Sequence, residues 1–168
     1  QQEAGGGTNI AQPLRDAHQQ IAQVQAQQQQ HNAAALPSTP IILLITDGAT
    51  WDEHEIVTEA QQRAASADAP GHGAGQGGGL PRIMTFGLGP YCNHQFLKTL
   101  SSLSGGYNVN SLSRATLKAK MDRLVVVCEA PVLTNLHIEG LPLEAELTSD
   151  RLPDLYLGQP VVIGIKYR

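Results

Sequence analysis

The chain is 168 residues long, carries a formal net charge of -4 and is 41% hydrophobic. This length is sufficient for one globular domain, or for part of a domain with a small appendage. The weakly acidic balance and the lack of a basic run argue against nucleic acid as the main partner. No apolar run reaches the length of a membrane span, since the longest, residues 41–45, has the length of a strand.

The start of the chain and its two cysteines leave the cellular compartment open. No signal-peptide pattern stands at the N-terminus, and we expect the natural start to lie upstream because Gln1 is not a methionine. Cys92 and Cys128 form no C-x-x-C pair, and no zinc-type ligands surround them in the sequence. Two free thiols are expected, one in a loop and one on a helix face, with a disulfide between them as the alternative.

A first helix is predicted after the glycines of residues 5–7. Apolar residues recur at helical spacing, as Ile10, Leu14, Ala17, Ile21 and Val24. Thr8 or Asn9 is predicted to cap this helix, and Pro13 suits its first turn, where no helical hydrogen bond is lost. The helix is expected to lead into a Gln-rich tract at residues 25–39, of low complexity and exposed to solvent.

A strand and a second helix are predicted next. Residues 41–45 (IILLI) are too few for a helix and rich in β-branched side chains, which predicts a strand covered on both faces. Thr50 and Glu53 have the spacing of a capping box. Helical spacing follows at Ile56, Val57, Ala60 and Ala64. Residues 68–80 are dominated by glycine and predict a flexible surface loop, without the Lys-Ser or Lys-Thr of a phosphate-binding loop.

The alternation of strand and helix continues through residue 128. Residues 82–87 predict a strand, and Asn93 is predicted to cap a helix that ends at Gly105 and Gly106. The apolar face of that helix is Phe96, Leu97, Leu100 and Leu103. A short strand is predicted at residues 107–109. The last helix is expected to place on one face Leu117, Met121, Leu124, Val125 and Cys128.

Together these elements predict an α/β fold with a mainly parallel, Rossmann-like sheet. After Pro131 the apolar period becomes two, at residues 132–139 and again at residues 161–168. This period is typical of antiparallel strands with one exposed face. We therefore expect two units: an α/β unit at residues 1–130, and a partial β-structured unit at residues 131–168 that the end of the sequence interrupts.

Asp47 is the first candidate for a functional residue. It directly follows the predicted strand at residues 41–45, and ligands of open parallel sheets bind beyond the carboxyl ends of the strands. The alternative is that Asp47 only forms a turn with Gly48. Thr8 has two interpretations of the same kind, as a helix cap or as a ligand.

Other candidate sites have less support in the sequence. Gly87-Leu88-Gly89 follows a strand but lacks the third glycine of a dinucleotide-binding motif, and no nucleophile elbow occurs. The six histidines are scattered without the spacing of metal ligands, and His54 is expected on the surface. Asp52 and Glu53 are interpreted as charges that stabilise the positive end of a helix dipole.

Several segments occur in the order that they have in a von Willebrand factor A domain. They are residues 6–10 (GGTNI), 41–48 (IILLITDG), 82–89 (RIMTFGLG) and 105–107 (GGY). The chain resembles that family over nearly its whole length, apart from the Gln-rich tract and the Gly-rich loop. Residues 131–136 (PVLTNL) and 152–162 (LPDLYLGQPVV) are similar to the segment that follows this domain in inter-alpha-trypsin inhibitor heavy chains.

The resemblance implies a metal ion-dependent adhesion site. In that family an Asp-x-Ser-x-Ser motif on the first strand, a Thr before a later helix and the Asp of a T-D-G turn hold Mg²⁺. An acidic group of a protein partner completes the coordination. Thr8 and Asp47 match the second and third of these features, and the first has no match in this sequence. The resemblance therefore implies a protein-binding module, not an enzyme, that is metal-dependent in its intact parent and holds Mg²⁺ weakly or not at all in this chain.

The resemblance also implies that the N-terminal strands of the domain are missing. The first strand would pair beside residues 41–45, so this apolar strand is expected to be an open edge. The isolated chain is therefore expected to aggregate or to be only marginally stable. An extracellular or cell-surface location is one option that the family offers, and the sequence does not decide it.

Two other functions stay open. The first is a nucleotide-dependent enzyme on a doubly wound α/β fold, and the second is a structural scaffold that keeps the fold without the metal. A thermal-shift response to nucleotides alone would favour the enzyme. Partner binding that is unaffected by Asp47→Ala would favour the scaffold.

Overall fold

The computed structural model of the chain describes residues 9–31, 39–67 and 80–129, and in the C-terminal part residues 133, 136, 138–148, 152, 154–158, 160 and 162–167. The helices are α1 (Ala11–His31), α2 (Glu53–Ala67), α3 (His94–Leu103) and α4 (Arg114–Glu129). The strands are β1 (Ile41–Thr46), β2 (Arg82–Leu88), β3 (Asn108–Ser111), β4 (Ala145–Leu147) and β5 (Ile165–Tyr167). None of the described helices is long and apolar enough to cross a membrane.

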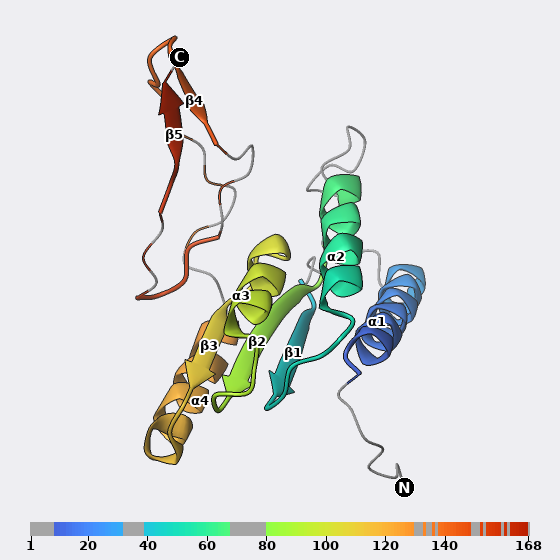
Figure 1. The fold of residues 1–168 in the computed structure, drawn as a ribbon. Helices are drawn as coiled ribbons and strands as arrows, with labels where there is room; N and C mark the ends of the chain where they lie inside the picture. Colours follow the sequence, from blue (N-terminus) through green and yellow to red (C-terminus); the bar gives the residue numbers. More distant parts are fainter. Residues whose placement is uncertain are drawn as a thin grey trace, which may run out of the picture.

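The strands β1, β2 and β3 form a parallel sheet in that order (Figure 1). Its register pairs Ile41 with Arg82 at one end of β1 and Thr46 with Gly87 at the other. The strands β4 and β5 form a separate antiparallel pair. The predicted α/β fold, a parallel sheet followed by an antiparallel β unit, is therefore confirmed.

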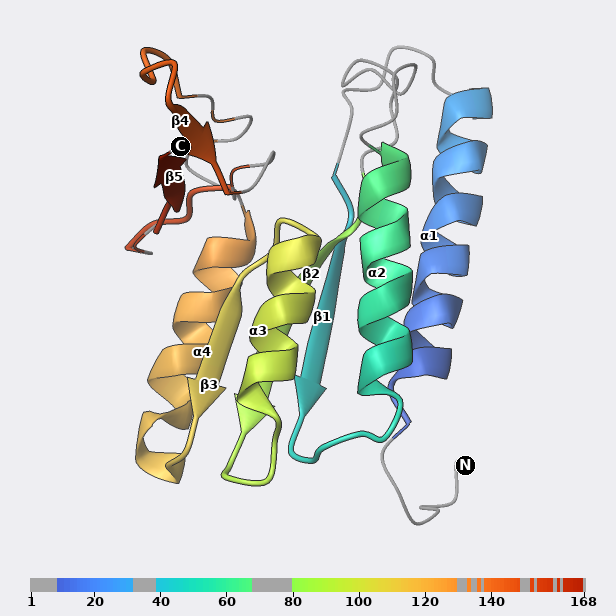
Figure 2. The ribbon, with the colours of Figure 1, turned by 45° about the horizontal axis from the view of Figure 1, so that its top comes forward.

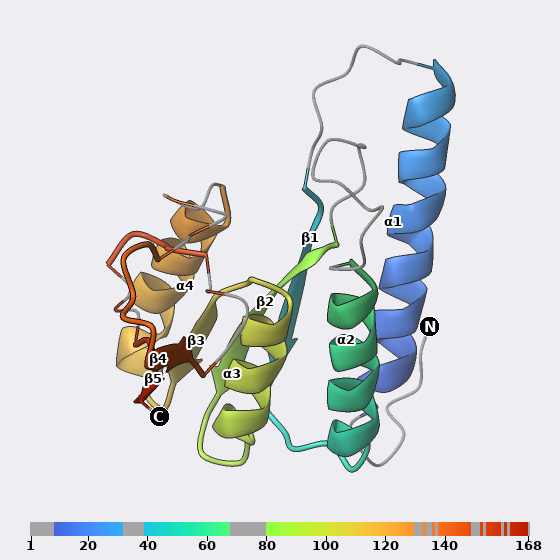
Figure 3. The ribbon, with the colours of Figure 1, turned by 90° about the horizontal axis from the view of Figure 1, so that it is seen from above.

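Helices lie on both sides of the parallel sheet, and each side has its own apolar cluster (Figure 3). On the side of α1, α2 and α3 the buried residues are Ile10, Ala11, Leu14, Ile56, Ile83, Cys92, Phe96, Leu97 and Leu100. On the side of α4 they are Met84, Phe86, Tyr107, Leu124, Val127 and Tyr156. β2 contributes to both clusters because successive side chains of a strand point to opposite faces.

Within the described residues β1 is an edge strand of this sheet, as predicted. Ile42 and Leu44 pack, partly buried, against the first cluster. By contrast, Ile41, Leu43 and Ile45 are 39%, 44% and 46% exposed. The prediction that both faces of this strand are covered is therefore wrong. The reason is the position of α4, which lies over β3 and β2 and leaves the second face of β1 open.

The helix α1 begins as predicted and extends further than predicted. The Asn9 side chain accepts a hydrogen bond from the Gln12 N–H at 3.2 Å, and Pro13 lies in the first turn. The helix continues to His31, through part of the Gln-rich tract, because Gln and Ala have favourable helix propensities. The remainder of that tract at residues 32–38 and most of the predicted Gly-rich loop, at residues 68–79, lie outside the described residues.

The helix α3 and the turn after it follow the prediction. The Asn93 side chain accepts a hydrogen bond from the Phe96 N–H at 3.1 Å, so Asn93 caps the helix. Gly105 has a φ angle of +68°, which a glycine adopts without steric cost. A Cβ on Gly106 would lie 2.1 Å from the Ile83 carbonyl oxygen. The turn can therefore lie against β2 only because this residue has no side chain.

The helix α4 presents a slightly different face to the sheet from the predicted one. Its apolar residues that are buried or partly buried are Leu117, Met121, Leu124, Val127 and Cys128. Val125 is 52% exposed, so its assignment to the buried face is wrong. It follows Leu124 by one residue, which turns a helical side chain by about 100°.

The C-terminal part contains shorter strands than predicted. In the first predicted segment Leu133 forms an isolated antiparallel bridge with Leu155, and in the second β5 spans Ile165–Tyr167. Residues 132, 134, 135, 137, 161 and 168 of these segments lie outside the described residues. The antiparallel direction is as predicted, but the partner of β5 is β4 at Ala145–Leu147, which lies outside both predicted segments. All three residues of β5 are exposed, so the prediction of one covered face is wrong for this strand.

Asp154 and Tyr156 connect the C-terminal part to the α/β part. The Arg82 guanidinium binds Asp154 Oδ2 at 2.8 Å, and both side chains are mostly buried. The Tyr156 hydroxyl donates to Gly105 O at 2.6 Å, and its ring centroid lies 5.6 Å from that of Tyr107. Burial raises the pKa of Tyr156 to about 12. The side chain of Tyr156 is thus a member of the second apolar cluster of the sheet.

Candidate functional site

The carboxyl ends of β1, β2 and β3 meet at one edge of the sheet, as Figure 2 shows. We call this region the carboxyl edge and define it by the loops that follow the strands, residues 46–53, 88–94 and 111–114. The amino-terminal turn of α1 also lies there, because it is bonded to the first of these loops. Ligands of open parallel sheets bind at such edges, so a functional site is expected at the carboxyl edge.

Asp47 lies at the carboxyl edge, directly after β1, as predicted. Its neighbour Thr46 is buried and closes the turn with its own hydroxyl, which donates to Gly48 O at 3.2 Å and accepts from the Gly48 N–H at 3.4 Å. The Asp47 residue is exposed. The hydrogen bonds of this turn therefore come from Thr46, and the Asp47 carboxylate is presented to solvent.

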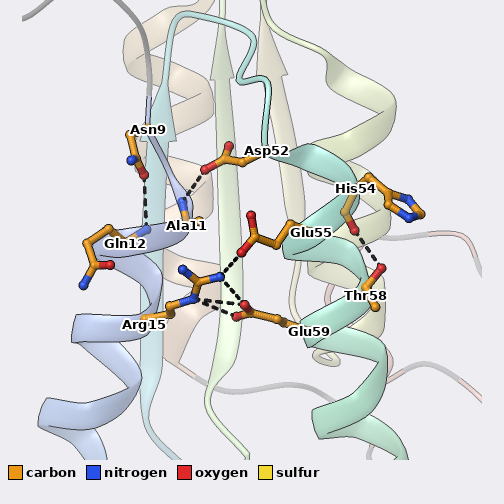
Figure 4. Close-up of polar contacts among 9 residues, drawn as sticks. All are labelled: Asn9, Ala11, Gln12, Arg15, Asp52, His54, Glu55, Thr58 and Glu59. Atoms are coloured by element: carbon orange, nitrogen blue, oxygen red, sulfur yellow. Dashed lines mark hydrogen bonds and ion pairs between the residues drawn. The ribbon is translucent and has the colours of Figure 1, made fainter.

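Thr8 lies outside the described residues, so its role as a ligand stays a prediction. The residues that follow it are held at the carboxyl edge by Asp52. The Ala11 N–H donates to Asp52 Oδ2 at 3.1 Å, as drawn in Figure 4. This hydrogen bond connects the first turn of α1 to the loop between β1 and α2.

Asp52 serves two helices at this junction. Its carboxylate accepts hydrogen bonds from the Ala11 N–H and from the Thr50 hydroxyl, and its backbone carbonyl accepts the Ile56 N–H of α2 at 3.0 Å. Burial opposes ionisation, but the hydrogen bonds from Thr50 and from backbone N–H groups outweigh it and lower the pKa of Asp52. A charged carboxylate at the start of a helix is stabilising, and this one lies at the start of both α1 and α2.

The predicted capping box of Thr50 and Glu53 is wrong. The helix α2 begins at Glu53, so Asp52 takes the N-cap position. The Thr50 hydroxyl binds the Asp52 carboxylate, a charged acceptor only two residues away. The interpretation of Asp52 as a charge at a helix start agrees with the structure. Sequence spacing gave no sign that it also binds α1, 41 residues earlier in the chain.

A second polar contact holds α1 against α2, a little further along both helices. The Arg15 guanidinium binds the carboxylates of Glu55 and Glu59, with Nε 2.9 Å from Glu59 Oε1. Figure 4 shows these two glutamates on one face of α2, both directed toward Arg15. The hydrogen bond from Arg15 holds the pKa of Glu59 below its usual range. These contacts add to the burial of Ile10 and Leu14 in fixing where α1 begins.

The start of α3 is joined to the start of α2 at the same edge. The Asn93 side chain donates from Nδ2 to Glu53 Oε2 at 2.6 Å, while its Oδ1 caps α3. His94 follows, with Nε2 3.0 Å from Gly89 O and a buried Nδ1 that has no partner within the described residues. A Cβ on Gly87 would lie 2.8 Å from this Nδ1. The first glycine of Gly87-Leu88-Gly89 is therefore required by packing.

Cys92 lies beneath the carboxyl edge, buried between β1 and β2. Its Sγ is 3.0 Å from Thr46 O and 3.3 Å from Leu88 O. Burial raises the pKa of the Cys92 thiol, and the charge of Asp47 raises it further. Such a thiol stays protonated near neutral pH and is a poor nucleophile or metal ligand. Cys92 in its loop and Cys128 on α4 are both free, as predicted.

The described residues alone do not complete a cation site. They contain no group of three His, Cys, Asp or Glu side chains that could hold a metal ion. Asp47 offers one exposed carboxylate, while Asp52 and Glu53 are bonded to neighbouring helices. Mg²⁺ prefers about six oxygen ligands, several of them waters. Thr8 and Asp47, the residues that the family resemblance assigns, would supply two.

The comparisons with known proteins give a partial structural likeness. No family model matches the sequence, and no curated protein matches it. Among solved structures the chain is similar to the ArnB paralog VWA2 from Sulfolobus acidocaldarius, with a TM-score of 0.39 and 17% sequence identity. The similar region covers 73% of this chain and 27% of that protein.

Proposed function

We propose that this chain is a protein-binding module of the von Willebrand factor A type, and not an enzyme, with its binding surface at the carboxyl edge. In the intact parent, a Mg²⁺-type cation at that edge would take Thr8 and Asp47 among its ligands. The observation that carries the proposal is the placement of Asp47. Asp47 is exposed in the loop that follows β1. Asp52 of the same loop accepts a hydrogen bond from the Ala11 N–H, which holds the start of α1 beside this loop.

The chemistry of the donor set supports this proposal. A carboxylate and a hydroxyl are oxygen ligands of the kind that Mg²⁺ binds, and Mg²⁺ keeps several waters that a partner can replace. The acidic group of a protein partner would replace one of them, which makes the cation part of the interface. The Asp-x-Ser-x-Ser motif would have to come from outside this sequence, because no such motif occurs in it.

The metal part of the proposal is tested by calorimetric titration with Mg²⁺ of the parent protein and of this chain. We expect the parent to bind Mg²⁺ and Asp47→Ala to weaken that binding by at least about tenfold. This chain should bind it weakly or not at all. Asp122→Asn is the matched control, since Asp122 is another exposed aspartate and lies on α4.

Two outcomes would contradict the proposal. A parent that lacks Asp-x-Ser-x-Ser and binds its partner equally well without Mg²⁺ would leave a metal-free scaffold. A thermal shift of this chain with nucleotides but not with divalent cations would favour the nucleotide-dependent enzyme instead.

A further inference from the structure

A cavity of about 530 Å³ lies between the outer face of α3 and the C-terminal part of the chain. Its α3 side includes Lys98, Thr99 and Ser102, and its other side includes Leu152, Val162 and Ile163. Cavities that bind small molecules have volumes of about 300 to 1,000 Å³ and are frequent where two parts of a fold meet. This cavity has the size and the position of such a site.

Buried contacts at the base of the cavity hold its two sides together. Gly105 and Asp154 both line it. Asp154 is bound by Arg82 of β2, and Gly105 O accepts a hydrogen bond from the Tyr156 hydroxyl. The C-terminal side is also joined to itself, because the Thr148 N–H donates to Gly164 O at 3.0 Å. The space between the two sides is therefore set by specific contacts.

The two sides of the cavity differ in polarity. On α3, Lys98 and Ser102 are exposed and belong to the face of the helix that is turned away from the sheet. On the C-terminal side, Val162 is 91% exposed and Ile163 is 38% exposed. Direct contact between these sides would place a charged ammonium against apolar side chains, which is unfavourable. A molecule that is apolar over most of its length and polar at one end would suit both sides.

The charge that the cavity offers to a ligand is positive. The two charged side chains that line it are Lys98 and Asp154. The Asp154 carboxylate is already bound by Arg82. Lys98 makes no ion pair with any residue that the structure describes. Its ammonium can therefore bind an anionic group from outside the chain, and a carboxylate is a strong acceptor for it.

We propose that this cavity binds small amphipathic carboxylates. The carboxylate is bound by Lys98, with the hydroxyl of Ser102 one helical turn further along α3 as a second donor. The apolar chain packs against Leu152, Val162 and Ile163. None of the loops at the carboxyl edge lines the cavity, so this binding needs neither Mg²⁺ nor a protein partner.

The test is a nuclear magnetic resonance titration of the isotope-labelled full chain with octanoate and, separately, with octanol. The two probes have the same apolar chain, and only octanoate carries the charge. We expect octanoate to bind roughly tenfold more tightly than octanol, because a charged group strengthens the hydrogen bond. The backbone signals that shift should be those of α3 and of residues 162–164.

Two substitutions separate the charge from the apolar wall. Lys98→Met keeps an unbranched apolar side chain and removes the ammonium, so octanoate should then bind no better than octanol. Val162→Ser should weaken the binding of both probes. Lys118→Met is the matched control, because Lys118 is an exposed lysine on α4 that does not line the cavity. All three variants should keep the wild-type thermal melt, since the substituted side chains are exposed.

Several outcomes would overturn the inference. Equal affinities of the wild-type chain for octanoate and octanol would remove the role of Lys98. Signal shifts outside α3 and residues 162–164, or no shifts at all, would leave a gap that only solvent fills. The proposed function fails separately: a parent that binds its partner without Mg²⁺ or Asp47 would contradict the metal site and leave octanoate binding untouched.

Discussion

The strands β1 and β2 are neighbours in one sheet, yet the more apolar of the two is the less buried. β1 reads IILLIT and alternates between exposed and partly buried positions, while β2 reads RIMTFGL and is buried at its five central positions. The difference comes from position, because β2 is flanked by strands and covered on both faces, whereas β1 is an edge with one covered face. Apolar composition therefore indicates that a strand can be buried. The position of the strand in the sheet determines whether it is buried.

The largest difference in stability is expected when one side chain on each strand is replaced by alanine. Phe86→Ala on β2 should cost about 3 to 5 kcal/mol of unfolding free energy, because the side chain is fully buried and leaves a cavity. Leu43→Ala on β1 should cost about 1 kcal/mol or less, since Leu43 is 44% exposed. Urea denaturation followed by circular dichroism measures both. Equal losses would show that the open face of β1 is covered in solution.

The starts of the two strands offer a second test. Ile41 of β1 pairs with Arg82 of β2 in the register, but only Arg82 is tied to the C-terminal part, through Asp154. Arg82→Ala should cost about 3 kcal/mol, because it leaves a mostly buried carboxylate without its partner. The double variant with Asp154→Ala should recover part of this loss in the same denaturation experiment. An additive loss in the double variant would mean that the two side chains do not interact.

The one covered face of β1 depends on how α1 is held, and a third test addresses that contact. Asp52→Ala should cost about 1 kcal/mol by removing the acceptor at the start of α1. Asp52→Asn, which keeps an acceptor oxygen, should cost less. Thermal melts of the two variants give the comparison, and equal losses would show that only the charge matters.

The stability that Asp52 contributes is expected to depend on pH. The pKa of Asp52 is lowered in the folded chain, so its carboxylate contributes stability that is present above the ordinary value of 3.8 and is lost as the pH falls below it. The difference in melting temperature between wild type and Asp52→Asn should therefore narrow below about pH 4. A difference that stays constant down to the acid limit would exclude this carboxylate as its source.

The smallest effect on stability is expected for a charge on the open face of β1. Leu43→Lys should change the unfolding free energy by less than about 1 kcal/mol, because the side chain reaches solvent. It should, however, reduce aggregation, since a lysine on an apolar edge strand discourages pairing with other chains. Size-exclusion chromatography at rising concentration measures this self-association. Leu157→Lys is the control, because Leu157 is an exposed leucine outside the parallel sheet. Equal self-association of wild type and Leu43→Lys would remove β1 as the cause.

Predictions from the sequence were correct where they rested on local chemistry. The cap at Asn93, the glycine turn at Gly105 and the strand at residues 41–45 each depend on a few neighbouring residues, and the structure confirms all three. The prediction for Thr50 was wrong because α2 begins at Glu53, which gives the N-cap position to Asp52, two residues after Thr50. Spacing in the sequence does not determine which of these two residues, both common at N-caps, precedes the first turn.

For the candidate site, too, predictions from local sequence were correct and contacts between distant residues were missed. Position after a predicted strand was enough to place Asp47 at the carboxyl edge, because parallel strands must all end at one edge. The contact between Asp52 and Ala11 joins parts of the chain that are 41 residues apart in sequence. No local pattern contains that information.

In the α/β part the sequence by itself thus determined the kinds of elements and their order, and it placed Asp47 directly after β1. In the C-terminal part it did not, because β4 lies outside the predicted strands. Periodicity and capping act over a few residues and can be read without knowledge of the fold. Only the tertiary structure decided that β1 is half-exposed, that Tyr156 belongs to the core and that Asp52 joins two helices. These features depend on which elements become neighbours, and sheet order and helix packing settle that after the local structure has formed.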